Sequence, residues 1–176
     1  MNIADAQVYV QGKSRRKPGK WLFLKSCKTQ EAFAKACTRI TGGDTPVFEN
    51  WYNIPEGLIS REALHEGFIA LSGCLGIYGR EKQSALSAYF TDEYAGKQEV
   101  SRFIVNLPQL SRDYIGTFET AGSFCLYRLK KSGLKNPGEF IACFDSERYV
   151  RGLEQSGDLK VIDKRYYFDN GTKDVL

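Results

Sequence analysis

The residues best suited to chemistry in this sequence are its single histidine, His65, and the carboxylates beside it. Glu62 and Glu66 are four positions apart in a segment that we expect to be helical, so their side chains would share one face, as an acid/base pair requires. Neighbouring carboxylates on an exposed helix more often form a solvated face, and we expect that here. His65 could act as a base for Cys74 only if folding brought the two together.

Other catalytic and ligand-binding motifs are missing from the sequence. It contains no Gly-x-Ser-x-Gly elbow and no Gly-x-x-x-x-Gly-Lys-Ser/Thr loop. Gly73, Gly76 and Gly79 have the wrong spacing for a dinucleotide fingerprint and are typical of helix ends. The histidine and the scattered carboxylates do not have the spacing of metal ligands. We therefore expect no catalytic residue, no cofactor and no metal.

The cysteines also favour a structural role. An odd number of them without a Cys-x-x-Cys pair argues against both a disulfide framework and a zinc site. We expect buried thiols. The five cysteines are Cys27, Cys37, Cys74, Cys125 and Cys143.

The composition predicts a folded protein outside the membrane. The chain has 176 residues, of which 42% are apolar, so disorder is not expected. It has no uninterrupted apolar run of about 18 residues, and its first residues lack the basic-then-apolar order of a signal peptide. We expect a cytoplasmic protein without membrane contact.

The positive charge is concentrated near the N-terminus. The formal net charge is +4, and residues 1–57 carry 9 Lys and Arg against 5 Asp and Glu. Two interpretations of the basic run that begins at Lys13 stay open: a flexible arm that contacts nucleic-acid phosphates, or a solvated hairpin loop. The cations of this run are Lys13, Arg15, Arg16, Lys17 and Lys20.

The first third of the chain predicts a three-stranded sheet covered by one helix. Residues 6–10 and 21–24 have the apolar and aromatic content of strands, and residues 48–54 supply the third strand. The helix between them has a cap at Thr29 and ends at Gly42-Gly43.

The middle third predicts a small helical domain. A first helix capped by Ser60 would place Leu64, Phe68, Leu71 and Leu75 on one face. Further helical segments are expected at 80–90 and 96–105, and we expect the domain to end at Pro108.

The last third predicts strands at 114–118, 140–144, 159–163 and 166–168, with helices after Thr120 and over 146–154. Asn170-Gly171 is a turn signal. The whole chain therefore predicts an α+β protein of three small domains. Their boundaries are 1–57 for an N-terminal α+β domain, 58–108 for a helical domain and 109–176 for a C-terminal α+β domain.

Four segments resemble motifs of the ArdA-type antirestriction proteins, in the same order along the chain. The most specific is the run of aromatic and acidic residues that leads into Pro-Glu-Gly-Leu. The four segments are Gly19-Lys20-Trp21-Leu22, Phe48-Glu49-Asn50-Trp51-Tyr52-Asn53-Ile54-Pro55-Glu56-Gly57-Leu58, Asp113-Tyr114-Ile115-Gly116-Thr117-Phe118, and Phe144-Asp145-Ser146-Glu147-Arg148-Tyr149-Val150-Arg151-Gly152-Leu153.

The resemblance implies an elongated three-domain protein, usually dimeric and associated with mobile genetic elements. Such proteins inhibit type I restriction-modification enzymes without catalysis, because they occupy the DNA-binding groove by mimicking DNA. The carboxylates that would imitate phosphates here are Glu49, Glu56, Glu62, Glu66, Asp145 and Glu147. The residues that match the antirestriction motif are Pro137, Phe144, Asp145, Glu147, Arg151 and Leu153.

The positive net charge departs from what this resemblance implies, since duplex DNA presents about one negative charge per 1.7 Å of axis. Two alternatives stay open. In the first, acids line one face while the basic run points elsewhere; Glu81, Asp92 and Glu93 would join the carboxylates named above. In the second, the fold is kept and the residues from Lys13 to Lys20 bind nucleic acid or a different protein partner.

Overall fold

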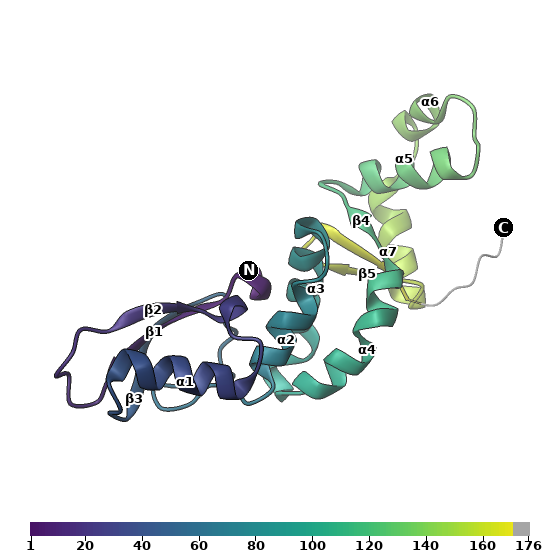
Figure 1. The fold of residues 1–176 in the computed structure, drawn as a ribbon. Helices are drawn as coiled ribbons and strands as arrows, with labels where there is room; N and C mark the ends of the chain where they lie inside the picture. The colour runs from purple at the N-terminus through teal and green to yellow at the C-terminus, as the bar shows by residue number, and fades with distance from the viewer. Residues whose placement is uncertain (171–176) are drawn as a thin grey trace. The chain divides into compact units, whose positions relative to one another are not determined.

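The first three strands form one antiparallel sheet in the computed structural model, which describes residues 1–170 (Figure 1). β1 lies between the other two, in the order β2-β1-β3. Val8 and Val10 of β1 are fully buried whereas Tyr9 between them is half-buried, which is the alternation that a sheet with one covered face requires. The strands are β1 (Gln7–Gly12), β2 (Lys20–Phe23) and β3 (Pro46–Tyr52).

One helix, α1 (Gln30–Thr41), covers the buried face of this sheet. The Thr29 hydroxyl accepts a hydrogen bond from the Ala32 N–H at 3.1 Å, and Gly42 ends the helix with a left-handed φ of 69°. Phe33 of α1 packs on Phe48 of β3 with ring centroids 5.9 Å apart. The predicted sheet and helix of the first third are confirmed.

β3 ends in the aromatic and acidic run on which the resemblance rests. Asn53 follows the strand with a left-handed φ of 57°, a conformation that asparagine tolerates. The Leu58 N–H then donates to the Pro55 carbonyl at 3.2 Å, and Gly57 has a φ of 86°. The turn predicted from Pro-Glu-Gly is therefore present.

The helix predicted to start at Ser60 is wrong, because α2 begins only at Phe68 and ends at Leu75. Ile59 and Leu64 pair in an isolated antiparallel β-bridge, and the Ser60 hydroxyl accepts from the Ala63 N–H at 3.1 Å. This side-chain hydrogen bond satisfies a backbone donor within a turn, so it competes with helix formation. Leu64 is buried as expected, but in the bridge and not on a helix face.

Two longer helices complete the middle third: α3 (Arg80–Glu93) and α4 (Val100–Asp113). The helical segment predicted at 96–105 begins later and extends further, since α4 continues through Pro108. The domain end expected at Pro108 coincides with the boundary between the two compact units described below. A proline inside a helix costs about 3 kcal/mol. The buried face of α4, formed by Val100, Phe103 and Leu107, offsets that loss.

The N-terminal 3₁₀ turn η1 (Ile3–Asp5) joins the sheet to these helices. The Ile3 N–H donates to the buried Ser87 hydroxyl of α3 at 3.1 Å, and the buried Ser72 hydroxyl of α2 donates to the Ile3 carbonyl at 3.2 Å. The N–H and the carbonyl of Ile3 are thus both hydrogen-bonded to side chains of the helices in the middle third. Two further 3₁₀ turns are η2 (Leu24–Ser26) and η3 (Ala95–Lys97).

The last third contains the second three-stranded antiparallel sheet, with the order β4-β6-β5. Its core includes Phe124, which stacks on Tyr167 with ring centroids 4.5 Å apart. The predicted cap at Thr120 is confirmed, since its hydroxyl accepts from the Ser123 N–H at 3.1 Å. The elements are β4 (Tyr114–Thr117), α5 (Ala121–Lys131), α6 (Pro137–Ala142), α7 (Ser146–Ser156), β5 (Leu159–Ile162) and β6 (Tyr166–Asp169).

The strand predicted at 140–144 is wrong, because these residues lie in and just after the short helix α6. Pro137 occupies its first turn, where a fixed φ suits a helix and the missing N–H is not needed. The predicted turn at Asn170-Gly171 extends outside the described residues.

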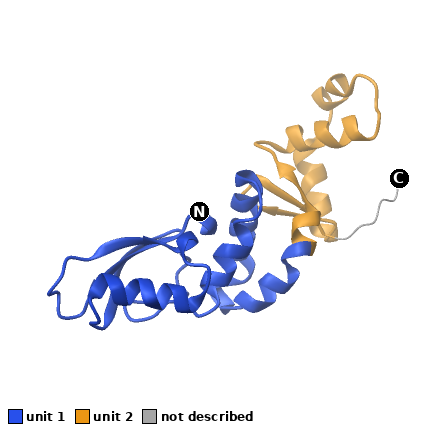
Figure 2. Ribbon diagram, in the orientation of Figure 1, with its two compact units in different colours: residues 1–108 blue, residues 109–176 orange. Residues whose placement is uncertain are grey.

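The chain divides into two compact units, 1–108 and 109–176 (Figure 2). The mixed α+β class is confirmed. The division of the first unit at residue 57, and with it the arrangement of three domains, stays a prediction. No helix within residues 1–170 is long and apolar enough to span a membrane.

Candidate functional site

Helix α7 and its N-cap hold four of the six residues that match the antirestriction motif. Asp145 is its N-cap, and the Oδ1 atom of this carboxylate accepts the Arg148 N–H at 2.9 Å. Phe144 and Leu153 are partly buried against the core of the second unit. Glu147 and Arg151 are exposed. The motif therefore combines a helix cap and two packing residues with two side chains that are free to meet a partner.

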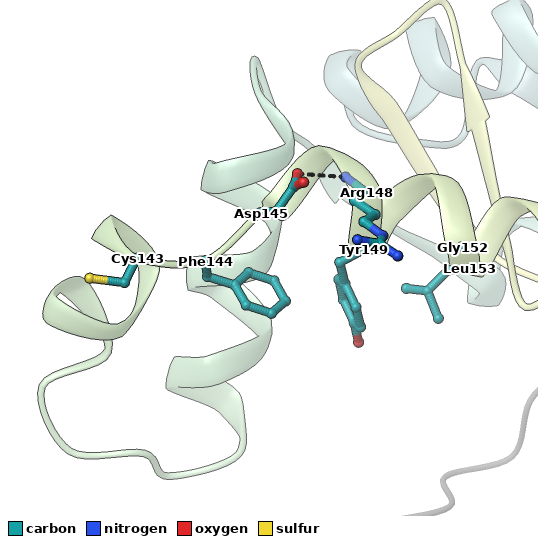
Figure 3. A pocket seen from close by; sticks show the side chains of 7 residues that line it. All are labelled: Cys143, Phe144, Asp145, Arg148, Tyr149, Gly152 and Leu153. Atoms are coloured by element: carbon teal, nitrogen blue, oxygen red, sulfur yellow. Dashed lines mark hydrogen bonds between the residues drawn. The ribbon is translucent and has the colours of Figure 1, made fainter.

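Two open hollows flank α7. The first has a volume of about 590 Å³, and Phe144, Tyr149 and Leu153 form its apolar wall (Figure 3). The rings of Phe144 and Tyr149 have centroids 5.4 Å apart. The second has a volume of about 640 Å³, and Glu147, Arg148 and Arg151 give it a polar wall. An apolar wall beside mixed charges can provide contact surface.

Glu49 lies on β3 and is neutralised within the protein. Its Oε1 atom is 2.7 Å from Nη2 of Arg15 and 3.5 Å from Nη2 of Arg61. Its side chain is only 24% exposed. Two guanidinium groups thus balance one carboxylate, which leaves Glu49 a poor substitute for a phosphate.

Glu56, Glu62 and Glu66 are exposed and form no ion pair with any other residue in the range 1–170. Since helix α2 begins after them, the expectation that Glu62 and Glu66 share a helix face is wrong. Their segment is fixed near the start of α4 by a hydrogen bond of 3.2 Å from Gln98 to the Gly57 carbonyl. Three unpaired carboxylates therefore project from one anchored segment.

His65 is half-buried in that segment and not in a helix. Its Nδ1 atom accepts the Gly67 N–H at 3.1 Å, so the imidazole is used in a local turn. Cys74 lies on α2 and is half-buried. Within the described part of the chain, no group of three or more His, Cys, Asp or Glu side chains is placed to hold a metal ion.

The basic run connects β1 to β2, and all five of its cationic side chains are exposed. Its base is held in place, because the Lys13 N–H donates to the Thr45 carbonyl at 2.9 Å. Next to it, the Ser14 N–H and hydroxyl donate to one carboxylate oxygen of Asp44 at 2.7 and 2.5 Å. The hydrogen bonds from Ser14 hold the pKa of Asp44 below its usual value of 3.8.

Two cations of the run have partners inside the protein. Arg15 is paired with Glu49, as described above. A Cβ atom built on Gly42 would lie 2.5 Å from Nζ of Lys17, so this ammonium lies against the C-terminal end of α1, where backbone carbonyls attract a cation. Lys13, Arg16 and Lys20 form no ion pair within residues 1–170, although the charge of Arg16 helps to lower the pKa of Asp44.

The five cysteines differ in how deeply they are buried. Cys27, Cys37 and Cys125 are buried as expected, whereas Cys74 is half-buried and Cys143 is exposed. Burial raises the pKa of Cys37 to about 11, and the neighbouring Cys27 adds to this effect. Thiolate chemistry at Cys37 is thereby suppressed.

The sequence did not lead us to expect a binding role for the aromatic side chains on the uncovered face of the first sheet. Trp21, Phe23 and Tyr52 are 39%, 50% and 58% exposed. Their strand assignments were predicted, and the alternation along each strand placed them opposite the α1 face. That alternation was the signal that could have identified them.

A comparison of the sequence with protein-family models and with curated proteins finds no match.

Proposed function

We propose that this protein is a non-catalytic, antirestriction-like inhibitor that binds a type I restriction-modification enzyme by mimicking DNA. The observation that carries the proposal is the exposed and unpaired state of Glu56, Glu62 and Glu66 on one anchored segment. This segment begins within the aromatic and acidic run that most resembles the antirestriction proteins. An inhibitor of this kind needs carboxylates that are not already neutralised, since they must replace phosphates.

The structure changes which of the six predicted carboxylates we expect to contact the enzyme. Glu49 is balanced by Arg15 and Arg61, and Asp145 is used as a helix cap. We therefore assign the contacts to Glu56, Glu62 and Glu66 in the first unit and to Glu147 in the second. In α7, Arg151 would contribute a polar contact at the rim of the hollow that it lines.

The positive charge of the first unit determines what we expect of the association rate and of the source of the affinity. Residues 1–108 carry 14 Lys and Arg against 11 Asp and Glu. A net acidic field that would steer the protein into a basic groove is therefore missing from this unit. We expect association to be slow and the affinity to come from direct contacts.

Capture of a type I enzyme by the immobilised protein tests the proposal. The informative variant changes Glu56, Glu62 and Glu66 to Gln together, and the matched control changes Glu119, Glu139 and Glu154 to Gln. All six side chains are exposed and both variants lose the same charge. We expect near-stoichiometric capture by the native protein and the control, and loss of capture by the first variant. Failure of the native protein to bind any type I enzyme would reject the proposal.

The homodimer implied by the resemblance is a separate proposal, which light scattering of the purified protein tests.

A second candidate function, nucleic-acid binding, is favoured by the exposed Lys13, Arg16 and Lys20 of the basic run. Each phosphate contact should make the affinity salt-dependent. Changing Lys13, Arg15, Arg16 and Lys17 to Ala should weaken salt-sensitive binding of DNA or RNA. Unchanged binding would reject this candidate.

A further inference from the structure

The uncovered face of the first sheet carries large aromatic side chains where an ordinary one-sided sheet carries polar ones. The opposite face, with Val8 and Val10, is buried under α1. In an antiparallel sheet with one covered face, the outward residues are usually polar. A group of exposed aromatic side chains is therefore informative, since exposed apolar patches mark sites of interaction.

The aromatic residues come from all three strands and contact one another. Tyr9 of β1 pairs in register with Trp21 of β2, and their rings meet edge to face with centroids 5.5 Å apart. Trp21 also stacks on Tyr52 of β3 at 5.1 Å with an interplanar angle of 27°. These two residues belong to the two outer strands, so their rings meet over the central strand. Phe23, on the same strand as Trp21 and two residues further on, extends this aromatic face.

The basic run returns to the sheet directly beside this face. A Cβ atom on Gly19 would lie only 2.6 Å from Cε1 of Tyr9 and 2.7 Å from the Val10 carbonyl oxygen. The backbone at Gly19 is thus packed on the Tyr9 ring, which holds the end of the loop against the aromatic face. Lys20 follows as the first residue of β2 and pairs with the buried Val10, so its side chain leaves the strand on the α1 side, opposite to Trp21. The loop that carries the exposed Lys13 and Arg16 therefore ends beside the exposed rings.

We propose that this aromatic face binds single-stranded nucleic acid. Unpaired bases stack on aromatic side chains, whereas the cations of an adjoining loop contact the phosphates. Tyr52 and Trp21 would carry the stacking, with Phe23 beside them, and Lys13 and Arg16 of the loop would carry the phosphate contacts. Charge complementarity selects this occupant over an apolar peptide. Duplex DNA is disfavoured because its bases are already stacked and cannot reach a flat aromatic surface.

The inference rests on the second candidate function for its phosphate contacts and goes beyond it in the kind of nucleic acid and in the residues that bind. It does not depend on binding to a type I enzyme. Cross-strand aromatic pairs also stabilise sheets, so the test must include a measurement that stability alone does not change.

Fluorescence anisotropy with labelled oligo-dT and oligo-U of about 12 nucleotides, and with a duplex of equal length, tests the inference. Stacking of one base contributes a factor of about 5 to 150 in affinity, so Trp21→Ala and Tyr52→Ala should each weaken single-strand binding by about tenfold or more. Trp21→Phe should retain most of the affinity, because it keeps a ring. Ile77→Ala removes a side chain that is 77% exposed in the same unit and serves as the control. Thermal unfolding of each variant separates a folding defect from a binding defect.

The outcomes separate the inference from the function on which it rests. Tighter binding of either single strand than of the duplex, lost in Trp21→Ala and kept in Ile77→Ala, supports the inference. Equal binding of duplex and single strands, unchanged in Trp21→Ala and Tyr52→Ala, overturns it while leaving the basic run as a nucleic-acid contact. Absence of binding to all three probes overturns both.

Discussion

The substitution Glu49→Gln distinguishes a carboxylate that contacts a partner from one that is neutralised inside the protein. Glu49 lies 2.7 Å from Arg15 and 3.5 Å from Arg61, and the two arginine side chains are 62% and 66% exposed. Removing the charge changes little in the core but releases both guanidinium groups.

The expected loss of stability is small. An ion pair between exposed side chains contributes about 0 to 1 kcal/mol, and the longer of these two contacts should contribute least. We expect a total of about 1 kcal/mol, which corresponds to about 2 to 4 °C in Tm for a protein of this size. Differential scanning fluorimetry measures this shift.

The effects on binding are more informative. Each phosphate contact on a single strand adds about 0.7 to the slope of log affinity against log salt, so two released arginines should steepen it by up to about 1.4. Capture of a type I enzyme should stay unchanged, because Glu49 is already balanced. Glu31→Gln, which changes the same charge on α1 without releasing an arginine, is the control. Loss of enzyme capture in Glu49→Gln, but not in Glu31→Gln, would refute our reasoning about this carboxylate.

Three further predictions concern the cysteines and a helix cap. Cys143 is the exposed thiol, so it should react first with a thiol reagent at neutral pH, and Cys143→Ser should remove that fast phase; a fast phase that persists would contradict the assigned exposure. Because the fold raises the pKa of Cys37 from 9.0 to about 11, its contribution to stability should be complete below pH 9 and decline as the pH rises to 11, and denaturant unfolding should show a smaller alkaline loss in Cys37→Ala than in the native protein. Thr120→Ala should destabilise the second unit by about 1 kcal/mol, whereas Thr120→Ser should retain the cap; equal denaturation midpoints for the two variants would show that the cap contributes nothing.

Local signals predicted most of the elements. Helix α1 begins after Thr29 and ends before Gly42, and α5 begins after Thr120. These ends were predictable because caps and left-handed glycines act within a few residues of the helix end. The errors occur where a turn hydrogen bond or the packing of a helix face outweighs the sequence pattern. Leu64 pairs with Ile59 in a bridge and not on a helix. The helix expected at 96–105 extends to Asp113, because its buried face outweighs the cost of Pro108. The sequence pattern alone does not show that the bridge is favoured over a helix, or that the buried face of α4 outweighs the cost of its proline.

The sequence predicted which charged residues the candidate site contains, but not which of them pair with one another. The sequence identifies the basic run and the carboxylates, but it does not show that Arg15 reaches Glu49, which is 34 residues away along the chain. It also does not show that Asp145 caps a helix while Glu147, two residues further on, stays free. Whether a charge is available to a partner depends on such contacts, and these arise only from the folded structure.

Displacement of DNA from a type I restriction-modification enzyme tests the central proposal most directly. Labelled duplex DNA bound to the enzyme would be titrated with the native protein, with the variant in which Glu56, Glu62 and Glu66 are Gln, and with the control in which Glu119, Glu139 and Glu154 are Gln. We predict near-stoichiometric displacement by the native protein and the control, and displacement weaker by about tenfold or more for the first variant, since each lost charged contact contributes about 1.5 to 3 kcal/mol. No displacement by the native protein, or equal displacement by all three, would contradict the proposed mimicry of DNA.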